Sequence, residues 1–122
     1  MSMVEIYTWR ETAWGTTDLT GFEVEATDGG IGKVDEDTNH VQAQGFIVVD
    51  TGPWIFGRKV MLPAGAITAI DHDDGKVFVD RTKDEIKDSP EFDEERFREE
   101  TYRTQVGDYY RSRPTDRTTL PR

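Results

Sequence analysis

Short apolar runs with the period of β-strands dominate residues 22–80. Thirteen of the seventeen Val and Ile residues fall in this stretch, and β-branched side chains favour pleated strands. At residues 22–26 three apolar side chains alternate with two glutamates, a pattern typical of a half-buried strand. Residues 45–49 form a continuous apolar run, typical of a strand buried on both faces. We therefore expect a mainly β domain.

Turn residues separate these runs. Asp28-Gly29-Gly30 predicts a tight reversal, with residues 31–35 as the return strand. Further strands are predicted at 58–62, 66–70 and 76–80, and Asp71-His72-Asp73-Asp74-Gly75 predicts the turn between the last two. Because the strands follow at short spacing without helices between them, they favour a small barrel or sandwich.

The pattern becomes helical after Arg81. Thr82 and Glu85 match a capping box, which predicts a short helix. Ser89-Pro90 offers an N-cap followed by proline at the first helical position, so we expect a longer helix after it. The predicted organisation is an N-terminal aromatic segment (1–17), a β domain (18–93), a C-terminal helix (94–111) and a disordered polar tail (112–122).

Composition narrows the function classes. The 122 residues suffice for one ordinary domain, and the net charge of -10 disfavours direct binding of nucleic acid. Cysteine is absent and only His40 and His72 are present, so we expect no thiolate nucleophile, metal or other cofactor, and place both histidines at the surface. Neither a membrane-spanning apolar run nor a signal-peptide pattern occurs, so we expect no membrane insertion and a soluble, cytoplasmic protein.

Two short motifs suggest ligand sites but depart from the required patterns. Gly30-Ile31-Gly32-Lys33 has Thr27 where a phosphate-binding loop needs glycine, so a hairpin turn is the better interpretation. The acidic segment 71–75 lacks the spacing of a calcium loop. Cation binding by this segment together with Asp80 stays open. The acidic run 35–37 is interpreted as a solvated edge, with docking of a basic partner as the alternative.

Several short segments follow one another in a recognisable order. They are 18–24 (DLTGFEV), 28–35 (DGGIGKVD), 45–50 (GFIVVD), 57–63 (GRKVMLP), 77–80 (VFVD), 85–86 (EI) and 89–92 (SPEF). In this order they resemble the PRC-barrel family: the first three are similar to its opening, 57–63 to its strand ending in proline, and the rest to its closing strand and helical exit. The resemblance covers residues 18–93, and its motifs are structural glycines, aspartates and a proline.

This resemblance implies a small, strongly bent β-barrel that serves as a docking surface. The module also occurs in the photosynthetic reaction centre H subunit and in a ribosome maturation factor, and the family pattern supplies no catalytic residue. We therefore expect a non-enzymatic docking or assembly protein with a protein partner, including a second copy in a homodimer. The alternatives are a peripheral subunit of a membrane bioenergetic complex, with the carboxylates of 35–37 relaying protons, and a ribosome or RNA-particle assembly factor.

Aromatic residues outside the predicted strands mark the candidate contact surface. Glycines flank three large apolar residues in the connection at 52–57, and two more tryptophans lie in the N-terminal segment. Such residues either cover the core of their own chain or contact a partner. The candidate interaction residues are Trp54, Ile55, Phe56, Trp9 and Trp14.

Overall fold

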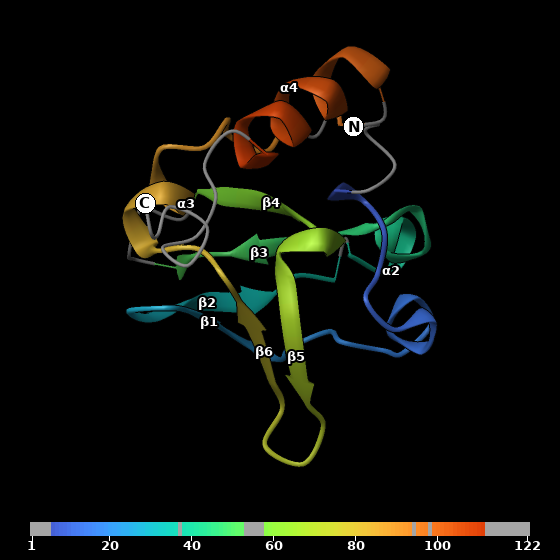
Figure 1. Cartoon of the computed structure of the whole chain (residues 1–122), viewed down its shortest axis with the longest axis vertical. Coiled ribbons are helices and arrows are strands. Elements are labelled where there is room, and N and C mark those ends of the chain that lie inside the picture. Colours follow the sequence, from blue (N-terminus) through green and yellow to red (C-terminus); the bar gives the residue numbers. More distant parts are fainter. Residues whose placement is uncertain (1–5, 37, 53–57, 94, 98, 112–122) are drawn as a thin grey trace, which may run out of the picture.

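The computed structural model describes residues 6–36, 38–52, 58–93, 95–97 and 99–111 (Figure 1). The strands are β1 (Glu23–Ala26), β2 (Gly29–Val34), β3 (Phe46–Asp50), β4 (Lys59–Pro63), β5 (Ile67–Asp71) and β6 (Lys76–Val79). The α-helices are α2 (Thr38–Val41), α3 (Lys83–Lys87) and α4 (Glu100–Arg111). Short 3-10 helices are η1 (Thr12–Gly15), η2 (Gln42–Gln44) and η4 (Ala64–Ala66).

The six strands form one mixed sheet in the order β4-β3-β2-β1-β6-β5. The pair β1–β6 is parallel and the other neighbours are antiparallel. The strands β4 and β5 follow each other in the chain, joined by η4, yet they form the two opposite edges of the sheet. The mainly β prediction and the C-terminal helix are confirmed, but the sheet is not closed and the predicted barrel is not confirmed.

The first reversal lies slightly earlier than predicted. Ala26 pairs with Gly29, so Thr27 and Asp28 form the turn, and the Gly-Ile-Gly-Lys motif lies within β2 instead of in a turn. The carboxylate of Asp28 accepts the backbone N–H of Lys83 at 2.8 Å. This contact anchors the turn to the start of α3. Local turn preferences cannot predict such a contact, because it joins residues far apart in the sequence.

The helical prediction after Arg81 is right for the first helix, whereas the second helix begins later than predicted. Both bonds of the capping box at Thr82 are present at the start of α3. The longer helix begins only at Glu100, because the chain after Pro90 extends along β4. Glu91 forms a bridge with Val60, and the N–H of Phe92 donates to the carbonyl of Lys59 at 3.2 Å.

Both ends of the described chain complete the hydrophobic core. Ile6 and Trp14 from the N-terminal segment are buried with the strands, as are Tyr102, Val106 and Tyr110 of α4. In Figure 1, α4 lies across one end of the molecule, above β4 and β3, while the β5–β6 hairpin projects at the opposite end. The β domain therefore shares its core with the two segments predicted to be separate from it.

A row of alternating charges crosses the sheet. The pairings of all neighbouring strands place opposite charges directly across from each other, and none of these side chains is fully buried. Each such cross-strand pair contributes about 0.2–1 kcal/mol and disfavours a shifted register. From one edge to the other, the row is Asp71, Lys76, Glu23, Lys33, Asp50 and Lys59.

We predict that Gly45→Ala destabilises the protein by at least about 3 kcal/mol. Gly45 has φ 100°, and an added Cβ would overlap the carbonyl oxygen of Tyr7. Gly21 has φ 84° but nothing within 4 Å of an added Cβ, so Gly21→Ala should cost only ~1–2 kcal/mol of backbone strain. Urea denaturation of both variants measures the difference, and equal losses would contradict the close approach of residue 7.

Candidate interaction surface

The projecting β5–β6 hairpin carries an exposed aromatic side chain. Among the described residues, Phe78 is the large hydrophobic side chain that is exposed, at 37%. The strand burial pattern explains this, because Val77 and Val79 face the core and Phe78 between them must face outward. Its strand neighbours are Ala69 on β5 and Glu25 on β1. The sequence contained this signal as a Val-Phe-Val alternation, but only the sheet shows which face stays uncovered.

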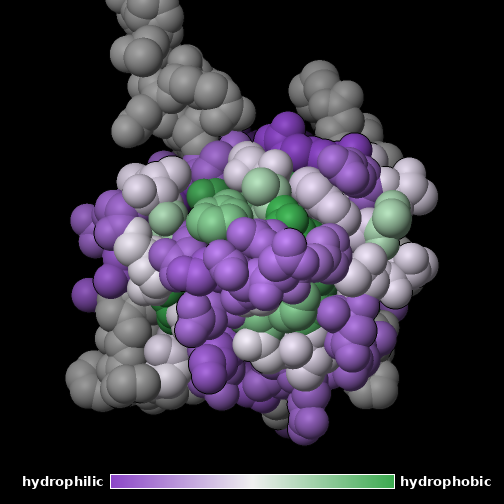
Figure 2. Space-filling view, turned by 90° about the horizontal axis from the view of Figure 1, so that it is seen from below, coloured by the Kyte–Doolittle hydropathy of each residue, from purple (hydrophilic) through white to green (hydrophobic). Residues whose placement is uncertain are grey.

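A groove runs beside Phe78 along the edge strand β5. Its volume is about 590 Å³, and residues 69–73 together with Phe78 line it; we call it the β5 groove. Figure 2 views the molecule from the end at which the hairpin projects, and apolar side chains lie on both sides of the hydrophilic residues at its centre. The β5 groove therefore combines three apolar residues, Ala69, Ile70 and Phe78, with polar residues of the turn, beside an edge strand where another chain can pair.

Acidic residues line and surround this groove. The turn carries Asp71, Asp73 and Asp74, and the N–H of Asp74 donates to the carboxylate of Asp71 at 3.0 Å. His72 packs edge-on against the ring of Phe22, with centroids 6.1 Å apart. On the adjoining strands, the ammonium of Lys76 is shared between two glutamates, with oxygens 3.8 and 3.9 Å away. The surface thus combines an exposed ring with a net negative rim.

Of the predicted contact residues, the structure describes Trp9 and Trp14. Trp14 is only 7% exposed and belongs to the core. Trp9 is half-buried, and its indole N–H donates to the carbonyl of Gln42 at 2.9 Å. Both tryptophans therefore cover the core of their own chain, one of the two roles expected for them. Trp54, Ile55 and Phe56 lie outside the described residues.

The proposed cation site at the acidic turn is not formed with Asp80. That carboxylate lies beyond the far end of β6, where it bonds to Arg81. No cluster of three or more potential metal ligands occurs within the described part of the chain. In the acidic run 35–37, Asp35 lies 3.5 Å from the ammonium of Lys59. Residue 37 and the side chain of His40 are not described.

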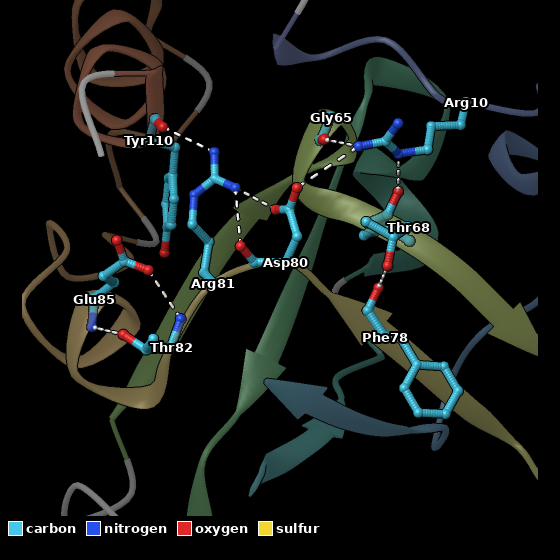
Figure 3. A network of polar contacts seen from close by, with 10 residues as sticks. Arg10, Gly65, Thr68, Phe78, Asp80, Arg81, Thr82, Glu85 and Tyr110 are labelled. Atoms are coloured by element: carbon cyan, nitrogen blue, oxygen red, sulfur yellow. Dashed lines mark hydrogen bonds and ion pairs between the residues drawn. The ribbon is translucent and has the colours of Figure 1, made fainter. Parts of the chain in front are cut away.

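A buried ion pair anchors the base of the hairpin (Figure 3). Asp80 and Arg81 are 8% and 6% exposed, and their side chains are bonded directly to each other. The Arg81 guanidinium also donates to the carbonyl of Tyr110 at 2.9 Å, and its carbon lies 5.8 Å from the centre of that ring. Buried charges require such partners because their desolvation is costly. The ion pair thereby joins β6 to the last turn of α4.

Arg10 extends this network to the N-terminal segment. Its Nε donates to the carbonyl of Ile67 at 2.9 Å, and its Nη2 lies 3.7 Å from the second carboxylate oxygen of Asp80 (Figure 3). The same Nη2 lies 3.5 Å from the carbonyl of Gly65. Arg10 therefore covers the beginning of the β5 edge, and the rest of that edge borders the β5 groove.

Tyrosine hydroxyls hold α4 to the rest of the chain. Tyr7 donates to the carbonyl of Arg103 at 2.7 Å, Tyr102 to that of Glu91 at 2.6 Å, and Tyr109 to that of Glu85 at 2.5 Å. Burial raises the pKa of Tyr102 to about 12. Burial also raises the pKa of Tyr7 and Tyr110 well above the ordinary value. The folded state therefore favours the protonated form of these tyrosine hydroxyls.

We predict that Arg81→Ala destabilises the protein by about 3–5 kcal/mol, since it leaves the carboxylate of Asp80 buried without its principal partner. The matched control is Arg96→Ala, which removes an exposed ion pair with Glu99 at 3.5 Å and should cost less than about 1 kcal/mol. Thermal and urea denaturation measure both values. A similar small loss in both variants would show that the buried pair does not anchor the hairpin.

Alkaline pH should unfold the protein. The folded state raises tyrosine pKa values above the unfolded value of about 10, so the stabilisation is complete below pH ~10 and is lost as pH rises toward the pKa of about 12 of Tyr102 and beyond. Fluorescence-monitored urea midpoints between neutral and alkaline pH test this. Tyr102→Phe should reduce the pH dependence, and an unchanged midpoint of the wild type across this range would contradict the expectation.

Within the described residues, the helices lack the length and apolar character needed to cross a membrane. Neither a scan against models of known protein families nor a search of curated proteins finds a match to this chain. The similarity to PRC-barrel domains therefore stands on the motif residues in the sequence alone.

Proposed function

We propose that this protein is a non-enzymatic docking or assembly module of the PRC-barrel type, that it self-associates, and that it acts in the cytoplasm. One observation carries the proposal: Phe78 is exposed beside the β5 groove, next to a sheet edge. An exposed apolar surface bordered by polar residues is typical of protein contacts. Association would cover the ring and supply partners to the edge backbone.

The placement of the family-like motifs supports this interpretation. The segments 18–24, 28–35 and 45–50 contribute to β1, β2 and β3, and the proline-ended segment 57–63 supplies β4, which ends at Pro63. The two edge strands are also consecutive in the chain, as they would be in a sheet bent toward closure. We infer from this order a strongly bent, barrel-like module whose uncovered edge serves for docking.

Self-association should depend on Phe78. We expect a concentration-dependent mass in light scattering across the micromolar to submillimolar range, and we expect Phe78→Ser to weaken association at least about tenfold, because burial of a Phe side chain contributes about 1.5–3 kcal/mol. The melting temperature should change little, because the ring is exposed in the single chain.

The matched control is Gln105→Ser, an exposed uncharged position on α4, at the end of the molecule opposite the hairpin (Figure 1). It should associate like the wild type. A wild-type protein that stays monomeric over the whole concentration range would refute self-association, and equal weakening by both substitutions would show that Phe78 is not at the contact.

A further inference from the structure

The hydrogen bonds at the start of β5 reveal which backbone groups face its open edge. The N–H of Asp80 donates to the carbonyl of Ala66 at 2.9 Å, so residue 66 bonds toward β6. The carbonyl of Ile67, the next residue, accepts from Arg10 and faces away from β6. In an antiparallel pair these two orientations alternate along the strand.

A bulge shifts this alternation by one residue. The register jumps between Ile67 and Ala69, so two residues of β5 lie opposite Phe78. The following pair, Ile70 with Val77, is then the next one that does not exchange hydrogen bonds. The N–H and C=O of Ile70 therefore point out of the sheet, into the open edge beside the β5 groove.

The other edge of the sheet is already occupied. Val60 of β4 forms a bridge with Glu91, and the carbonyl of Lys59 accepts the N–H of Phe92. The C-terminal part of the chain thus covers β4, in the way that proteins commonly protect an edge strand. Docking by strand addition is consequently available at β5 and not along this part of β4.

We propose that β5 pairs with β5 of a second copy of this chain, antiparallel, about a two-fold axis at Ile70. This inference rests on the proposed self-association and assigns its interface. A two-fold axis makes identical edges run antiparallel, and a residue on the axis then lies opposite itself. The outward N–H and C=O of Ile70 in each copy form two reciprocal hydrogen bonds, and the two half-buried Ile70 side chains pack together.

Charge complementarity favours a second copy as the occupant. In this register, the turn that follows Asp71 in one copy, which carries Asp73, lies toward the end of the other copy's β5 that begins at Ile67, whose carbonyl accepts from Arg10. The Arg10 side chain is 44% exposed, and Asp73 is exposed. Each acidic turn therefore meets a cation, and the two turns lie at opposite ends of the shared edge. This arrangement offsets part of the repulsion between two chains of net charge -10.

The side chains beside the axis leave room for the added strand. Ala69, opposite Phe78 on the outer face, is the smallest side chain of the strand and lines the β5 groove. The second copy places Asp71 across from it, and the exposed ring of Phe78 is covered from the side. The β5 groove and the outward N–H and C=O of Ile70 therefore lie on the same surface, where the second copy would pair.

The decisive comparison is Ile70→Pro against Ile70→Val. Proline removes the outward N–H but no bond to β6, a position where edge strands tolerate proline; valine retains the N–H and most of the side chain. Ile70→Pro should raise the dimer dissociation constant in sedimentation equilibrium at least about tenfold. Ile70→Val should stay within about threefold of the wild type. Circular dichroism and thermal denaturation establish that both variants are folded.

A charge variant keeps the test decisive if the proline variant does not fold. Asp73→Lys should weaken the dimer several-fold at low salt, with the difference from wild type largely lost at about 1 M NaCl, where charges are screened within about 3 Å. The control Asp88→Lys gives the same net charge as Asp73→Lys but lies at an exposed site on the α3 C-cap. Its dimer dissociation constant should match that of the wild type.

The outcomes separate the interface from the proposed function. A wild-type dimer that both Ile70→Pro and Asp73→Lys leave unchanged would overturn the β5 interface and leave self-association intact. A wild-type protein that is monomeric at every concentration would overturn both, and would direct attention to a basic strand of another protein as the occupant of the β5 groove.

Discussion

The buried ion pair of Asp80 and Arg81 is the contact on which the arrangement of this molecule depends. It lies where β6 ends, and Arg81 bonds to the carbonyl of Tyr110 in the last turn of α4. Arg10 reaches the same carboxylate from the N-terminal segment. Because buried charges require partners, the network at this point brings together three segments distant in the sequence. The projecting hairpin therefore has a fixed base.

The two edge strands differ in how far the rest of the described chain covers them, and the proposed function depends on this difference. The residues after Pro90 extend along β4 and supply it with backbone partners. Among the described residues, the side chain of Arg10 bonds to the beginning of β5, and the rest of β5 borders a groove with an exposed Phe78. An edge strand that retains unpaired groups is a site for association with another chain. Because the residues after Pro90 cover β4, β5 is the edge proposed for association.

A small sheet needs additional cover for its core, and this chain takes it from both ends. Trp14 enters the core from the N-terminal side, and Tyr110 from α4 is fully buried. The tyrosine hydroxyls that reach backbone carbonyls of other segments satisfy polar groups while the rings supply apolar area. This dual role explains why the described aromatic residues of the N-terminal segment and α4 pack in or against the core and are not free contact surfaces.

Local patterns in the sequence determined the element types. Alternation at residues 22–26, the turn at 71–75 and the capping box at Thr82 depend on neighbours within a few residues, and all three appear in the structure. At Ser89-Pro90 the local pattern predicts the start of a helix, but the chain there pairs with β4 instead.

Tertiary structure alone decided where the charges, aromatics and open edge lie. The charge row from Asp71 to Lys59 joins positions scattered over the chain, and only strand order and register bring them into line. The exposure of Phe78 likewise follows from which face of the sheet remains uncovered. Periodicity specifies that a residue faces one side of a strand, whereas burial depends on what the rest of the chain places there, and that is a property of long-range packing.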